Sequence, residues 1–153
     1  MVAILLILHG LVAAALLGAT THQAMSVLRR GARRGGSFLD RYAGVRAQGF
    51  TVAIVLLYVV NVCLGAVLYP SYRLNVRVPL EEMSMAWAIG LFELKEHLGG
   101  IGLGLLPLYA YTWRPEVAET HRRDRIALTM ILVVIVWWNF LVGHVVNNIR
   151  GLP

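Results

Sequence analysis

Four long stretches of apolar residues constrain the fold of this chain more than any other feature of its sequence. These stretches extend over about residues 2–28, 50–69, 85–113 and 126–146. Each stretch is at or above the roughly 20 residues that an α-helix needs to cross a hydrocarbon core of about 30 Å. Because a backbone in lipid must satisfy its own hydrogen bonds, we expect these stretches to be helices. The sequence therefore predicts an all-α integral membrane protein, a four-transmembrane-helix bundle that forms a single membrane domain over residues 1–153.

The composition agrees with a membrane environment and excludes several classes of function. Of the 153 residues, 58% are hydrophobic and only 14% are charged, whereas soluble domains are about 45–50% apolar and about 25% charged. The sequence contains no CxxC, CxxCH or HExxH motif and no phosphate-binding loop. The net charge of +6 comes from arginines beside the ends of predicted helices. Soluble-enzyme catalysis and nucleic-acid binding therefore have no support.

The arginines predict the topology. The first and third connections carry ten of the 14 basic residues, whereas the second connection has only Arg73 and Arg77. The positive-inside rule therefore places the first and third connections in the cytoplasm. The first apolar stretch lacks the basic start of a secretory signal, so we expect a retained helix. We predict a multi-pass protein of a bacterial-type inner (plasma) membrane, with its N- and C-termini outside. The arginines of the first connection are Arg29, Arg30, Arg33, Arg34, Arg41 and Arg46.

Three histidines are expected at one depth in the membrane. His9 lies near the outer end of the first predicted helix, and His144 lies near the outer end of the fourth. Counting about 20 residues back from Trp113, at a rise of about 1.5 Å each, places His97 in the outer leaflet as well. Ionisable groups inside a bilayer are costly, and they usually mark functional sites. Their shared depth predicts a binding site built from several helices.

The third predicted helix carries a glycine-lined stripe around His97. Gly90, Glu93, His97, Gly100 and Gly104 follow spacings of three and four residues, so they share one helical face. Glycines allow close approach of a neighbouring helix, and a flat cofactor could lie against the exposed backbone. We expect Gly100 to contact such a cofactor.

These features predict a haem site near the outer face of the membrane. Neutral imidazole is a good axial ligand for haem iron, and bundle cores are common places for such ligands. Arg73 and Arg77 are expected to bind the haem propionates. The arrangement resembles a small b-type cytochrome in which two of His9, His97 and His144 hold the iron. The function that follows is a membrane electron-transfer subunit of a larger respiratory or photosynthetic complex, rather than an enzyme in its own right.

Two other functions are compatible with the same residues. A non-haem iron, copper or zinc site, or a proton-handling site, could use His9, His97 and His144 together with Glu93 and Glu96. The chain could also be a cofactor-free structural subunit whose histidines join helices by hydrogen bonds. The expected partners are membrane lipid, other membrane subunits, and a quinone or an outer-face redox protein.

Overall fold

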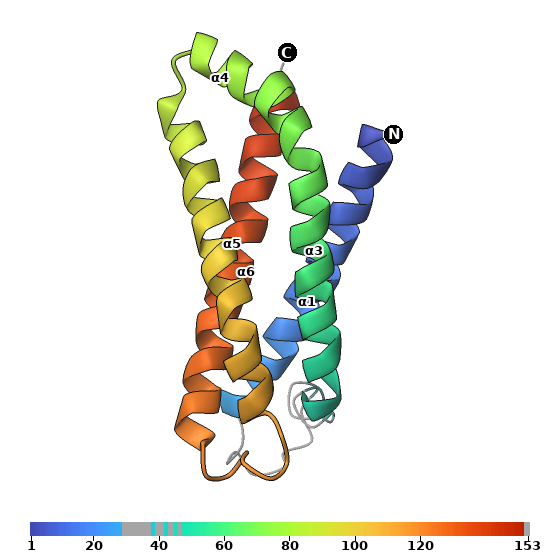
Figure 1. Ribbon diagram of the computed structural model, residues 1–153, viewed down its shortest axis with the longest axis vertical. Coiled ribbons are helices and arrows are strands. Elements are labelled where there is room, and N and C mark those ends of the chain that lie inside the picture. Colours follow the sequence, from blue (N-terminus) through green and yellow to red (C-terminus); the bar gives the residue numbers. More distant parts are fainter. Residues whose placement is uncertain (29–37, 39–41, 43–44, 46, 152–153) are drawn as a thin grey trace.

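The computed structural model describes residues 1–28, 38, 42, 45 and 47–151, and its long helices form an antiparallel bundle (Figure 1). The long helices are α1 (Val2–Leu28), α3 (Phe50–Tyr72), α5 (Ala86–Thr112) and α6 (Arg122–Gly151). The N-terminus of α1 and the C-terminal end of α6 lie at the same end of the bundle. The prediction of an all-helical chain with four long helices is confirmed for the described residues. The six arginines of the first connection lie outside them.

The α3 helix runs further than its predicted end at residue 69. It follows the 3₁₀ turn η1 (Ala47–Gly49) and continues through Pro70 into the π-helical turn η2 (Arg73–Arg77) and then α4 (Val78–Glu82). Proline removes a backbone donor and clashes with the carbonyl four residues earlier, and a π-turn absorbs such an irregularity without ending the helix. The sequence suggested that Arg73 and Arg77 lie in a loop. In the structure they lie on a helical turn instead.

The α6 helix begins at Arg122, four residues before the predicted apolar start at position 126. His121 Nδ1 lies 3.0 Å from the Asp124 carboxylate across this start. A negative charge in the first turn also interacts favourably with the helix dipole. Polar residues therefore extend the helix beyond the apolar stretch that hydropathy detects.

Among the described residues, three helical segments are long and apolar enough to cross a membrane, namely Val2–Leu28, Phe50–Glu82 and Arg122–Ile149. Of the residues in the most apolar part of the first segment, only 11% are buried inside the bundle. Most of its large apolar side chains therefore face outwards. The α5 helix is as long as α1, but Glu93, Lys95 and Glu96 lie within it. A fourth crossing by α5 remains a prediction.

The packed core occupies the end of the bundle where α1 ends and α3 begins. Gln23 of α1 donates to Thr51 Oγ1 at 3.2 Å and accepts a hydrogen bond from the Tyr109 hydroxyl. These buried polar groups join α1, α3 and α5 at that end. The opposite end of α1, from Met1 to Leu11, is exposed or half-buried. The core side chains are Leu16, Ala19, Val27, Ile54, Tyr58, Leu106, Tyr109, Trp113, Leu132 and Val136.

The α3 and α5 helices approach each other closely at Tyr58, within the packed core. The Tyr58 hydroxyl of α3 donates to the backbone carbonyl of Gly99 in α5 at 3.0 Å. A Cβ atom on Gly102 would overlap that hydroxyl and would lie 2.8 Å from Tyr58 Cζ. Gly102 therefore lets the ring of Tyr58 pass between the two helices. Beyond this contact, towards the chain termini, the bundle holds cavities.

Candidate functional site

The larger cavity lies between α1, α3, α5 and α6 and has a volume of about 570 Å³. Sites for small molecules typically span about 300–1,000 Å³ and combine apolar walls with a few polar groups. Apolar and small residues make up most of this lining. The polar side chains that line it are His9, Tyr58, Asn61, Tyr69, Ser71, Tyr72, Lys95, Glu96, Asn139, His144 and Asn147.

His9 enters this cavity from α1. Its ring faces Gly65 of α3, where a Cβ atom would lie 3.6 Å from His9 Cε1. His9 Nδ1 and Asn61 Oδ1 are buried and have no hydrogen-bond partner among the described residues. Burying an unpaired polar atom is costly. A bound group that used the lone pair of an imidazole nitrogen would remove that cost for His9.

His144 enters the same cavity from α6, which runs antiparallel to α1 (Figure 1). The Asn148 amide Nδ2 donates to His144 Nε2 at 3.0 Å. An amide nitrogen can only donate, so His144 Nε2 is the accepting nitrogen here. For Nε2 to bind iron, the exposed Asn148 side chain, one helical turn away, would have to move aside.

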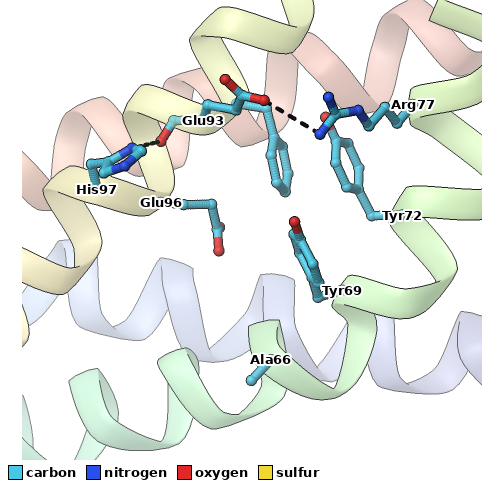
Figure 2. Close-up of a pocket in the computed structure, with 8 residues that line it drawn as sticks. Ala66, Tyr69, Tyr72, Arg77, Glu93, Glu96 and His97 are labelled. Carbon is cyan, nitrogen blue, oxygen red and sulfur yellow. Dashed lines mark hydrogen bonds and ion pairs between the residues drawn. The ribbon is translucent and has the colours of Figure 1, made fainter.

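His97 lines a second cavity of about 470 Å³, which lies between α3 and α5 (Figure 2). His97 Nδ1 lies 2.7 Å from the backbone carbonyl of Glu93. Since a carbonyl only accepts, Nδ1 carries the proton and Nε2 is left as the accepting nitrogen. The structure thus brings His9 and His144 to one cavity and His97 to its neighbour. The lining of the smaller cavity is Ala66, Tyr69, Tyr72, Arg77, Phe92, Glu93, Glu96 and His97.

The two arginines expected at the haem propionates lie beside the smaller cavity or on the surface. Arg77 Nε lies 2.8 Å from Glu81 Oε1, and Arg77 Nη1 lies 3.3 Å from Glu93 Oε1. These two carboxylates already balance the charge of Arg77. Arg73 is exposed on the same turn. Neither arginine is among the described residues that line the larger cavity.

Lys95 is the cation that lines the larger cavity, and the sequence did not assign it to the site. Its ammonium lies 3.1 Å from Glu96 Oε1 and 4.6 Å from the centre of the Phe92 ring. Lys95 lies off the stripe of His97 and Gly100, so the helical pattern gave no reason to place it at the site. The signal that could have found it is its position inside a long apolar helix.

The glycines of α5 serve different purposes. A Cβ atom on Gly100 would meet open space, and Gly100 lines the larger cavity. A Cβ atom on Gly99, also in the lining, would lie 3.5 Å from Asn139 Oδ1. Because Gly99 and Gly100 have no side chains, the backbone of α5 lines the cavity at these two residues.

The carboxylates and histidines do not gather into one group within the part of the chain that the structure describes. There, no group of three or more His, Cys, Asp or Glu residues lies close enough together to hold a metal ion. No family model matches the chain, and neither a curated protein nor a solved structure matches it. The two cavities and the side chains that line them are therefore the features that bear on function.

Proposed function

We propose that this chain is a membrane electron-transfer subunit that binds one b-type haem in the larger cavity, with His9 and His144 as axial ligands. The observation that carries the proposal is that these two imidazoles, from two antiparallel helices, line one cavity of about 570 Å³. A porphyrin supplies four equatorial nitrogens, so two imidazoles complete the coordination of its iron. Bound haem would supply a centre that gains and loses one electron at a time.

The lining of the cavity fits this group. His9 lines the cavity, and its Nδ1 atom has no partner among the described residues, so a turn of the ring could present an imidazole nitrogen to bound iron without breaking a hydrogen bond of Nδ1. Gly99 and Gly100 line the cavity without side chains, so a bound ring could approach the backbone of α5 there. Lys95, already at the cavity, is a cationic partner for a propionate. In this assignment Lys95 takes the role that the sequence suggested for Arg73 and Arg77.

We also propose that all four long helices cross a bacterial-type inner membrane, with both termini outside. The outward-facing apolar side chains of α1, α3 and α6 support a lipid environment, because soluble proteins rarely expose large apolar patches. The charged residues of α5, namely Glu93, Lys95 and Glu96, line the two cavities. The partners in this account are other membrane subunits and a one-electron carrier at the outer face.

Labelling of single cysteines tests this topology. In a Cys63→Ser background, Met83→Cys places a thiol between α4 and α5, and Glu116→Cys places one between α5 and α6. Both residues are exposed. A membrane-impermeant maleimide added to intact cells should label the first variant and should label the second only after the membrane is opened. The reverse pattern would contradict the orientation, and labelling of both in intact cells would contradict a crossing by α5.

A reduced-minus-oxidised visible spectrum of the purified chain, with metal analysis of the same sample, tests the haem. The chain should be produced with ample haem and extracted in mild detergent. A sharp α-band and close to one haem per chain are expected, because two imidazoles make the iron low-spin. A flat spectrum with bound iron, copper or zinc would favour a histidine–carboxylate metal site. A flat spectrum without bound metal would favour the alternative of a cofactor-free structural subunit.

A further inference from the structure

We propose that the smaller cavity binds the ring of a quinol, the lipid-soluble electron donor for the haem site. The proposal rests on the proposed function for its electron acceptor, but the binding itself depends only on the cavity. Three features argue for a flat, weakly polar ring with two oxygen atoms. They are an aromatic wall, a set of polar groups that point into the cavity, and a shared boundary with the larger cavity.

The aromatic wall consists of Tyr72 of α3 and Phe92 of α5. Their ring centroids lie 3.6 Å apart and their planes differ by 10°. Stacked rings offer a flat apolar surface to a third ring. The Tyr72 hydroxyl is buried and has no hydrogen-bond partner in the described part of the chain.

The polar groups come from both sides of the cavity. Figure 2 shows the Tyr69 hydroxyl and the Glu96 carboxylate pointing into the space between α3 and α5. His97 Nε2 is the accepting nitrogen of its ring, since Nδ1 donates to the Glu93 carbonyl. Above them, the ion pair between Arg77 and Glu93 joins η2 to α5 and covers the end of the cavity. A quinol has two hydroxyl donors, and Glu96 and His97 are two acceptors for them.

Glu96 belongs to the boundary between the two cavities. Five residues line both of them, so a ring in the smaller cavity would be next to a haem in the larger one. Glu96 is also exposed, as are Glu93 and His97, so the smaller cavity opens to the outside of the bundle between α3 and α5. A molecule dissolved in the bilayer could enter there. The shared residues are Ala66, Tyr69, Tyr72, Phe92 and Glu96.

The proposed reaction is the oxidation of a quinol in two steps, each of which releases one proton and one electron. Glu96 would accept the proton of one ring hydroxyl while one electron leaves the ring for a one-electron acceptor, a role that a haem held by His9 and His144 would supply. The electron would then pass to a one-electron carrier at the outer face. The second proton and the second electron leave in the same way. One quinol therefore yields one quinone, two protons and two reduced carriers.

The test uses the full-length chain in lipid nanodiscs, with duroquinol as the donor and haem content measured on every sample. Glu96→Gln removes the proton acceptor and should slow haem reduction by about 100-fold, in the range of general-base removal. Tyr69→Phe removes one hydrogen bond and should raise the KM for duroquinol about tenfold. Glu82→Gln, on an exposed residue of α4 that does not line either cavity, is the matched control and should change neither value.

The outcomes separate this proposal from the haem proposal. If the variants keep their haem and reduce normally with dithionite but fail with duroquinol, the quinol site is supported. If both variants keep the wild-type rate and KM, it is overturned. If the wild-type chain binds no haem, calorimetry with duroquinone decides the question. A loss of binding in Glu96→Gln and Tyr69→Phe, but not in Glu82→Gln, would support the site, and equal binding by all would overturn it.

Discussion

His144→Ala and His9→Ala are each expected to lower the haem content of the purified protein by more than about tenfold, since even the loss of an outer-shell partner typically reduces metal affinity by 10–100-fold. Both imidazoles line the cavity of about 570 Å³, and each would supply one of the two protein bonds to the iron. Removing either one leaves the iron with five ligands. The measurement is haem per chain, from the pyridine haemochrome spectrum and the protein concentration of the same monodisperse sample.

Three matched variants accompany this prediction. His97→Ala should keep haem near the wild-type level, because His97 lines the smaller cavity. Asn148→Ala should also keep it, because ligation by His144 replaces the hydrogen bond from Asn148. His144→Gly should regain haem when imidazole is added, because the free base can occupy the vacated space. Loss of haem from His97→Ala with retention in His144→Ala would contradict the assignment of the ligands.

Gly102→Ala is expected to destabilise the bundle by about 1–3 kcal/mol, the usual cost of overpacking a core. The added Cβ atom would overlap the Tyr58 hydroxyl and would lie 2.8 Å from Tyr58 Cζ and 3.3 Å from Ile135 Cγ2. Tyr58 is only 4% exposed, so its rigid ring has little room to move. Its displacement would also break the hydrogen bond to the Gly99 carbonyl.

The free energy of unfolding in mixed micelles, followed by far-ultraviolet circular dichroism, measures this effect. Gly104→Ala is the matched control on the same helix, since a Cβ atom there meets nothing within 4 Å. Alanine is a better helix former than glycine by about 1 kcal/mol, so this variant should be unchanged or slightly more stable. Equal stability of the Gly102→Ala and Gly104→Ala proteins would show that Tyr58 does not pack across Gly102 as described.

Hydropathy predicts the helices well because length and apolar composition are local properties of the sequence. The first stretch and α1 share the same bounds at positions 2 and 28. The end of α3 was not predictable in this way, because a π-turn after Pro70 lets the helix continue. The start of α6 was missed because charged residues near position 122 form helix without adding to an apolar stretch.

The composition of the two cavities was harder to foresee than the positions of the histidines along their helices. Depth follows from counting residues, but the cavity that a side chain enters depends on how each helix is rotated and which helix it faces. His97 and Gly100 share a stripe on α5, yet His97 lines only the smaller cavity and Gly100 only the larger. Two cavities meet along this face, and a helical pattern contains no information about that division.

Electron paramagnetic resonance of the oxidised, purified wild-type chain tests the central claim most directly, because the signal of ferric haem reports its axial ligands. We predict a low-spin spectrum typical of two imidazole ligands, which becomes high-spin in any haem that His9→Ala or His144→Ala retains. A high-spin spectrum of the wild-type protein, or a low-spin spectrum that persists in both variants, would contradict ligation of a haem by His9 and His144.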